Sequence, residues 1–163
     1  MQIQEMLPAD WQAVKMIYEQ GIATGNATFQ TKAPSWESWD AAHLKHSRLV
    51  AREAGKVLGW TALSGVSDRC VYAGVAEVSV YVATEARGKG LGKQLLEALV
   101  LESEKNGIWT LQAGLFPENL AGLKLHETCG FRLIGRREKI GKMNGLWRDT
   151  LLLEKRSQSI AAD

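Results

Sequence analysis

The sequence predicts one domain of the mixed α/β class (α+β), built on a single sheet. The chain has 163 residues, enough for one domain with a sizeable core. Segments with strand-like alternation are interleaved with segments of helical periodicity, in the order strand, two helices, three strands, helix, strand, helix, two strands. We expect residues 1–156 to form the domain and residues 157–163 to be a flexible tail.

The N-terminal segment predicts a short strand and a first helix. The strand is "IQEM", residues 3–6. Residues 10–20 form the helix, because their apolar side chains fall on one helical face. Those side chains are Trp11, Val14, Ile17 and Tyr18. Gly21 and Gly25 follow and are expected to end the helix.

A second helix is predicted directly after Pro34. Ser35 is a suitable N-cap, and the helix is expected to run to about His46. Trp36 and Trp39 are three residues apart, which places both on one face. Their spacing is more typical of packing than of ligand binding.

Three strands follow. Residues 48–53 and 56–64 form two of them, joined by a turn at Ala54-Gly55. Residues 74–83 form the third, which alternates well and carries Val75, Glu77, Ser79 and Tyr81 on one face. The later elements are a helix from the next glycine-rich segment to about Asn106, a strand at 108–115, a helix at 119–130, and a hairpin of 131–141 and 146–155 across Asn144-Gly145.

Composition excludes several classes of protein. A net charge of +2 is too small for a protein whose main partner is nucleic acid. No apolar run approaches the roughly 20 residues of a membrane span, and the N-terminus lacks the features of a secretory signal. Cys70 and Cys129 have no histidine at metal-binding spacing, so we expect no metal site and interpret both as buried free thiols. These features favour a cytoplasmic protein without a membrane partner.

The stretch "ARGKGLGKQLL" combines glycines and cations directly before an apolar helix. A P-loop fails, because Arg87 and Gln94 occupy the places of its first glycine and its Ser or Thr. The dinucleotide fingerprint fails, because Lys93 occupies the place of its third glycine. The pattern R-x-x-G-x-G fits, with Arg87, Gly90 and Gly92 in the required places.

This pattern favours binding of a pyrophosphate. Glycines let backbone amides approach an anion, and the helix that follows adds its positive N-terminal end. The alternative is an ordinary glycine-rich turn with solvated cations. The predicted binding residues are Arg87, Gly88, Lys89, Gly90, Leu91, Gly92 and Lys93.

Motifs on both sides of this stretch carry a wider resemblance. With "AEVSVYV", "PENLAGLKLHETCGF" and "LWRDTLLL", the sequence resembles the GNAT acetyltransferase superfamily over most of its length. "IYEQGIATGNATF" makes it most similar to the phosphinothricin and methionine sulfoximine N-acetyltransferase branch. The resemblance implies the GNAT fold: one mixed, mostly antiparallel sheet with a splayed central strand pair and helices on both faces. It also implies acetyl-CoA as co-substrate and a homodimer.

The resemblance assigns further residues to the cofactor. The backbone of Val80, Tyr81 and Val82 would bind pantetheine, and an amide near Val80 would polarise the thioester carbonyl. Asn119 matches the asparagine that opens the last family helix and reaches the cofactor. These strand side chains could instead be plain core and surface, and Asn119 could be an ordinary N-cap.

Glu77 is the candidate general base. A carboxylate within an otherwise apolar strand needs a partner or access to water, because an unpaired buried charge is costly. An ammonium must lose a proton before it can attack a thioester, which gives Glu77 a function. The alternative is an exposed or ion-paired strand residue.

His126 is the second catalytic candidate. It stands where the family commonly has a tyrosine proposed to protonate the departing thiolate, and Gly122 replaces a common alanine. The phosphinothricin-type branch commonly has histidine at this place. His126 could act as the general acid or could be a structural, hydrogen-bonded histidine.

The acceptor contacts are the least defined part of the prediction. The resemblance to this branch implies that Phe29, Tyr72, Glu77 and Ser79 flank the acceptor cleft, although Phe29 could equally be part of the core. Arg69 and Arg148 could pair with an acceptor carboxylate, although a solvated role is expected for each. The predicted activity is direct acetyl transfer to the α-amine of a small amino acid or analogue. A peptide N-terminus as acceptor and a non-catalytic acyl-CoA sensor remain alternatives.

Overall fold

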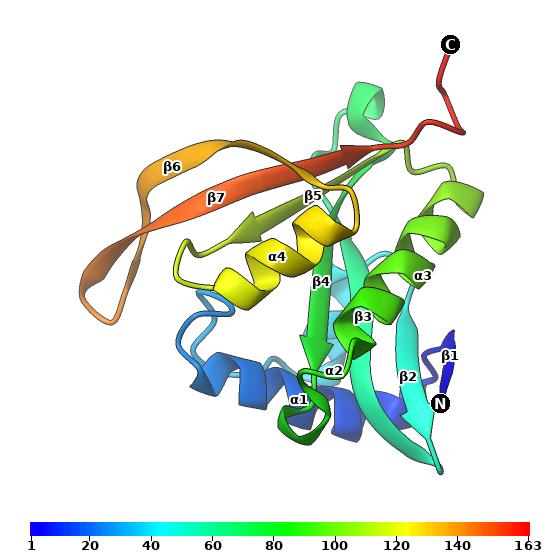
Figure 1. The fold of residues 1–163 in the computed structure, drawn as a ribbon, viewed down its shortest axis with the longest axis vertical. Coiled ribbons are helices and arrows are strands. Elements are labelled where there is room, and N and C mark those ends of the chain that lie inside the picture. The colour runs from blue at the N-terminus through cyan, green and yellow to red at the C-terminus, as the bar shows by residue number, and fades with distance from the viewer.

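In the computed structural model of residues 1–163, one sheet of seven strands runs through the molecule in the order β1-β2-β3-β4-β5-β7-β6 (Figure 1). The strands are β1 (Gln2–Glu5), β2 (Leu49–Glu53), β3 (Lys56–Gly65), β4 (Val75–Val82), β5 (Thr110–Leu115), β6 (Arg132–Met143) and β7 (Leu146–Arg156). The helices are α1 (Trp11–Ala23), α2 (Trp36–Ala42), α3 (Leu91–Lys105) and α4 (Leu120–Thr128), with short 3₁₀ turns η1 (Pro8–Asp10), η2 (Cys70–Tyr72) and η3 (Thr84–Ala86). The predicted order of elements is confirmed.

The β4–β5 pair is the only parallel pair in the sheet, and it is short. Its register covers Val75–Thr110, Ala76–Leu111 and Glu77–Gln112, and the two strands then separate (Figure 1). Beyond Glu77, β4 stays paired with β3 as far as Val82, whereas β5 stays paired with β7. The predicted mixed, mostly antiparallel sheet with a splayed central pair is therefore confirmed.

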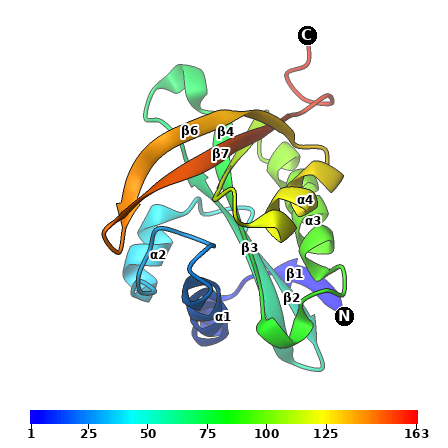
Figure 2. The ribbon, with the colours of Figure 1, turned by 60° about the vertical axis from the view of Figure 1, so that its left-hand side comes forward.

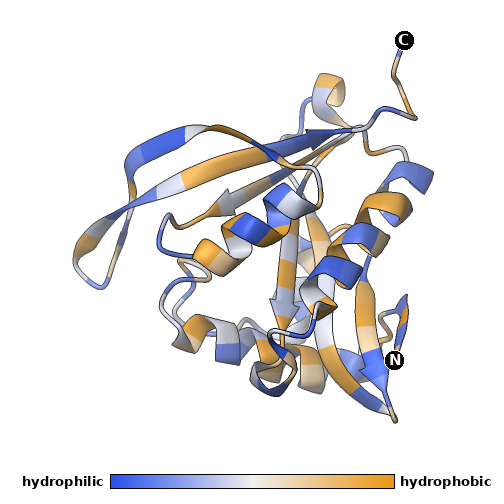
Figure 3. Ribbon diagram, viewed as in Figure 1, coloured by the Kyte–Doolittle hydropathy of each residue, from blue (hydrophilic) through white to orange (hydrophobic).

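Helices cover both faces of the sheet, as predicted. Figure 2 shows α1 and α2 on one side and α3 and α4 on the other. Along α3, hydrophilic and hydrophobic bands alternate (Figure 3), and its buried residues, Leu91, Leu95, Leu96, Leu99 and Ser103, form one stripe toward the sheet. On the opposite face, Trp39 of α2 and Trp60 of β3 are fully buried in edge-to-face contact. The tryptophan at position 39 is therefore core.

The end of α1 differs from its prediction. Gly21 lies inside the helix, which ends at Ala23, and Gly25, with a φ of +74°, follows the C-cap Thr24. A Cβ on Gly21 would lie 2.6 Å from the ring of Tyr81. Gly21 therefore permits close packing between α1 and β4 and does not terminate the helix.

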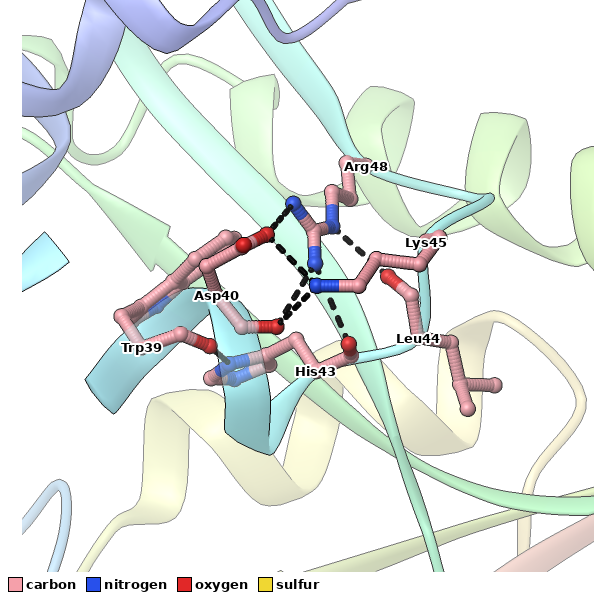
Figure 4. A network of polar contacts seen from close by, with 6 residues as sticks. All are labelled: Trp39, Asp40, His43, Leu44, Lys45 and Arg48. Carbon is pink, nitrogen blue, oxygen red and sulfur yellow. Dashed lines mark hydrogen bonds and ion pairs between the residues drawn. The ribbon is translucent and has the colours of Figure 1, made fainter. Parts of the chain in front are cut away.

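The end of α2 also differs from its prediction. Ser35 is the N-cap, its hydroxyl accepting from the Ser38 N–H, but the helix stops at Ala42 and not near His46. The Arg48 guanidinium donates to the carbonyls of Asp40 and His43, and Arg48 Nε donates to that of Leu44 (Figure 4). These bonds replace the next helical turn, because they satisfy carbonyls that a longer helix would have used.

The C-terminal residues and the two cysteines can be compared with their predictions. Ser157, the first residue of the expected tail, is buried, and its hydroxyl bonds Glu104. Cys70 is exposed and Cys129 is partly exposed, so the expectation of two buried thiols is wrong for Cys70. Both thiols are free. None of the helices combines the length and apolarity needed to cross a bilayer.

The Gly74→Ala substitution should lower the free energy of unfolding by about 1–3 kcal/mol. A Cβ at Gly74 would lie 2.0 Å from the Trp109 ring, and the Gly74 carbonyl accepts from the N–H groups of Trp109 and Thr110 at the start of the β4–β5 pair. The matched control is Gly65→Ala, where no atom lies within 4 Å. Urea denaturation should show a loss for Gly74→Ala alone, and equal losses would contradict this packing.

Candidate functional site

A cavity of about 930 Å³ opens where β4 and β5 separate. Because side chains alternate along β4, its residues line the cavity on two faces of the sheet. We call the face covered by α1 the α1 half, lined by Tyr18, Thr28, Phe29, Glu77, Ser79, Tyr81, Phe116, Arg137 and Thr150. We call the other face the α3–α4 half, lined by Val78, Val80, Val82, Arg87, Gly88, Gly90, Gly92, Asn119, Leu125 and His126. The structure thus brings most of the predicted residues together.

The glycine-rich stretch has a backbone that only glycine adopts readily. Gly88 and Gly90 have φ of +76° and +80°, and no atom lies within 4 Å of where a Cβ would be. Gly90 is the N-cap of α3, and the N–H groups of residues 89–93 donate no hydrogen bond within the chain. These unpaired donors at a helix N-terminus suit an anion.

The cations of this stretch occupy different positions. Arg87 lines the cavity, and its Nε donates to the Val82 carbonyl at 3.2 Å. Lys89 and Lys93 do not line the cavity, and Lys93 Nζ lies 3.8 Å from Glu97. Arg87 is therefore the cation that the fold directs to the cavity at this end.

Asn119 is the N-cap of α4, which is the alternative role given for it in the sequence analysis. Its Oδ1 accepts from the Gly122 N–H at 2.9 Å. A Cβ at Gly122 would lie 2.7 Å from Asn119 Nδ2, so glycine at this position makes room for the amide. The same side chain also lines the cavity.

His126 is buried on α4, at 4% exposure, and lines the α3–α4 half. Its Nδ1 lies 2.7 Å from the Gly122 carbonyl, which only accepts, so Nδ1 carries the proton. Burial lowers the pKa of His126, against the opposing effect of this hydrogen bond. At neutral pH the imidazole is therefore neutral and Nε2 is unprotonated.

Glu77 lies in the α1 half, just where the β4–β5 pair ends. It is half-buried and forms neither an ion pair nor a side-chain hydrogen bond within the chain. Its Oε1 lies 3.5 Å from where a Cβ of Gly114 would be, so the carboxylate lies over Gly114 of β5. The ion-paired alternative for Glu77 is excluded, and the carboxylate is open to the cavity.

Arg148 is half-buried and hydrogen-bonded within the chain, whereas a solvated role was expected for it. Its guanidinium donates to the Gly25 carbonyl at 2.7 Å and to Asn26 Oδ1 at 2.8 Å, and it lies 3.8 Å from the Phe116 ring centroid. A third contact, with Glu118 Oε2, is 3.2 Å long. Arg148 thus links β7 to the segment after α1 by hydrogen bonds at the edge of the cavity.

Phe29 belongs to the segment after α1. Its ring lies edge-on to Phe116, with centroids 4.8 Å apart, and lines the cavity. Ser79 lines the same half. Tyr72 does not line the cavity; it is exposed on η2 under the Arg69 guanidinium. The structure therefore does not bring Tyr72 and Arg69 to the other site residues.

Sequence reasoning missed the cavity residues that come from the C-terminal hairpin. They are Arg137, Ile140 and Thr150. Alternation within the predicted hairpin could have placed Thr150 and Arg148 on one face. A pair of extra residues in β6, between Arg137 and Gly141, sets which β6 side chain stands opposite Thr150. No simple pattern predicts such a bulge.

The His126→Gln substitution should weaken the dependence of stability on pH. Because burial holds the pKa of His126 low in the folded chain, the unfolded chain binds the proton first as the pH falls. The stability contributed by neutral His126 is therefore present above about pH 6.5 and lost below it. Urea titrations should show the stability difference between wild type and variant shrinking from pH 7 to pH 5. A difference that stays constant would contradict this assignment.

Comparisons with known proteins agree with the geometry. The model of the acetyltransferase (GNAT) family matches residues 10–131. The phosphinothricin N-acetyltransferase of Alcaligenes faecalis is 34% identical over 153 residues, covering 90% of this chain and 77% of that protein. The L-methionine sulfoximine/L-methionine sulfone acetyltransferase of Pseudomonas paraeruginosa is 30% identical over 152 residues, covering 90% and 88%.

A solved structure gives the same result. The GNAT superfamily phosphinothricin acetyltransferase from Sinorhizobium meliloti, in complex with AcCoA, has a TM-score of 0.86 at 27% identity, covering 99% of this chain and 91% of that one. This likeness agrees with the resemblance seen in the motifs. The chain therefore belongs to the acetyltransferase (GNAT) family.

Proposed function

We propose that this acetyl-CoA-dependent N-acetyltransferase transfers an acetyl group directly to the α-amine of a small amino acid or analogue. Methionine sulfoximine and phosphinothricin represent the class. The observation that carries the proposal is Glu77, an unpaired carboxylate facing the cavity where β4 and β5 separate. The names of the relatives support the acceptor class.

The α3–α4 half fits acetyl-CoA. The free N–H groups of residues 89–93, with Arg87 beside them, would hold the pyrophosphate. From Val78 to Val82, β4 has no partner on its β5 side, so its backbone groups there are open to pantetheine. Asn119 contributes its amide to the same half. When bound, acetyl-CoA supplies the activated acetyl thioester.

Glu77 is the group suited to accept the acceptor's proton. Burial raises the pKa of Tyr18 and of Tyr81, so both hydroxyls keep their protons at neutral pH. No lysine lines the cavity. Glu77 would take the proton of the ammonium, directly or through one water, and leave its lone pair free. The Val80 N–H would donate to the thioester carbonyl oxygen, where negative charge develops.

Neither cysteine supports a covalent route. Cys70 and Cys129 do not line the cavity, and burial raises the pKa of the Cys129 thiol. Transfer directly from thioester to amine is therefore the simpler assignment. The homodimer, the cytoplasmic location and the flexible tail stay predictions.

The Gly90→Val substitution should abolish the rise in Tm that acetyl-CoA produces. A β-branched side chain is strained at a φ of +80° and would shift the N–H groups that follow. Gly55→Val is the matched control, because Gly55 has a φ of +79°, equally open surroundings and a place in the β2–β3 turn. Thermal melts with and without acetyl-CoA should show the shift lost for Gly90→Val and kept for Gly55→Val. An unchanged shift in both variants would remove the loop from cofactor binding.

The Glu77→Gln substitution should lower kcat by roughly 10²–10⁴-fold while acetyl-CoA binding stays the same. Gln keeps the shape but cannot accept the proton. The deficit should shrink as the pH rises toward the pKa of the acceptor amine, which then arrives deprotonated. Glu118→Gln is the comparison, since Glu118 is the cavity's other carboxylate and engages Arg148. Turnover rates of wild type and of both variants with methionine sulfoximine, measured from pH 6 to 10, give the deficit and its dependence on pH. Full turnover by Glu77→Gln at neutral pH would reject Glu77 as the base.

A further inference from the structure

Arg137 is a cation that the fold leaves without a partner inside the cavity. It is exposed, lines the α1 half, and forms no ion pair or side-chain hydrogen bond within the chain. The other arginines of the hairpin all have partners, and the Arg156 guanidinium donates to the carbonyls of Ser157 and Ile160. Arg132 pairs with Glu154, Arg136 with Asp149 and Arg148 with Glu118. The guanidinium of Arg137 is therefore available to a ligand.

No other cation is placed to serve an acceptor bound near Glu77. Among the arginines and lysines of the chain, only Arg87 and Arg137 line the cavity. Arg87 follows the far end of β4, and the five residue-to-residue steps from Glu77 to Val82 alone span about 16 Å. That distance assigns Arg87 to the cofactor end. The Arg148 guanidinium already has partners, because it donates to Gly25 and Asn26 after α1 and pairs with Glu118.

The strand register places Arg137 on the same face of the sheet as Glu77. Glu77 is paired with Gln112 of β5, and its carboxylate lies over Gly114. Gly114 is paired with Leu152 of β7, and Thr150, two residues along β7, is paired with Arg137. Residues two apart and residues directly paired share one face.

The spacing of these groups suits a compact zwitterion. Arg137 lies about 7 Å along the strands and about 10 Å across two strands from Gly114. A long arginine side chain spans part of that separation, so an α-amino acid between the two charges would meet both. Thr150, the strand partner of Arg137, also lines the cavity, and its hydroxyl makes no hydrogen bond within the chain.

We infer that Arg137, with the Thr150 hydroxyl, binds the α-carboxylate of the acceptor while Glu77 faces its α-ammonium. This inference rests on the proposed function and names the feature by which the site recognises a free amino acid. A guanidinium offers two parallel N–H donors to a carboxylate. A peptide N-terminus has an amide at that place and leaves Arg137 unpaired. The subsite therefore selects free α-amino acids over peptides.

Asp149 holds the backbone that presents Arg137. Its Oδ1 accepts from the Lys139 N–H and its Oδ2 from Arg136 Nε, both at 2.7 Å. Lys139 has a φ of +47° within the pair of extra β6 residues. The carboxylate thus stabilises the bulge that fixes Arg137 opposite Thr150.

The test compares L-methionine sulfone with its α-amide, at saturating acetyl-CoA, in wild type, Arg137→Gln and Arg137→Lys. Wild type should prefer the acid. Arg137→Gln should raise KM for the acid by about 10- to 100-fold, the worth of a charge-assisted hydrogen bond, with kcat and the amide's kcat/KM nearly unchanged. Arg137→Lys should recover part of the loss. Arg132 lies on the same strand but outside the cavity, so Arg132→Gln is the control. It should change neither the KM for the acid nor the kcat/KM for the amide.

The outcomes separate this inference from the function on which it rests. If wild type acetylates the acid and Arg137→Gln keeps the same preference for acid over amide, the Arg137 subsite is wrong and the proposed function stands. If wild type prefers the amide, the subsite is also wrong. If wild type acetylates neither compound nor any other amino acid while acetyl-CoA still raises its Tm, the proposed function fails and the inference fails with it.

Discussion

The separation of β4 from β5 after the Glu77–Gln112 pair is the constraint on which the site depends. β4 stays with β3 along its whole length, and β5 stays with β7, so neither strand can follow the other. The separation leaves backbone groups of β4 without a strand partner in the interior of a sheet. Such groups need another partner, which a cofactor lying along the strand can provide. It also opens a passage between the two faces, so a cofactor from one side can meet an acceptor on the other.

The α1 half is bordered by closely packed side chains at both of its edges. Gly21 lets α1 approach β4 so closely that the Tyr81 ring lies against the helix backbone. Tyr18, Tyr81 and Trp60 form a cluster of nearly parallel rings, with the Tyr81 centroid 4.9 Å from each of the other two and those two 5.7 Å apart. At the opposite edge, Arg148 ties Gly25 and Asn26 to the hairpin. The start of the segment between α1 and α2 is anchored in this way, and Phe29 further along it packs edge-on against Phe116 beside the cavity.

The sequence predicts those parts of the structure that depend on local pattern. Alternation in β4, the Asn144-Gly145 turn and the glycine spacing at α3 are each local, and they predicted the order of elements and the α3–α4 half. What it did not predict depends on tertiary contacts. Gly21 looks like a helix end until Tyr81 lies against it, and α2 stops early because Arg48 takes its carbonyls. Arg137 reaches the cavity only through the β6 bulge held by Asp149.

The two catalytic candidates lie on opposite faces of the sheet, and this limits what each can do. Glu77 shares the α1 half with the acceptor contacts, whereas His126 shares the α3–α4 half with the cofactor contacts. His126 keeps its one proton on Nδ1, in the bond to Gly122, so Nε2 has none to donate at neutral pH. A thiol with a pKa near 8.5 needs little acid assistance to leave as thiolate. The geometry thus favours the structural alternative for His126, and it leaves the proposed deprotonation of the acceptor by Glu77 as the step for which this chain has a suitably placed side chain.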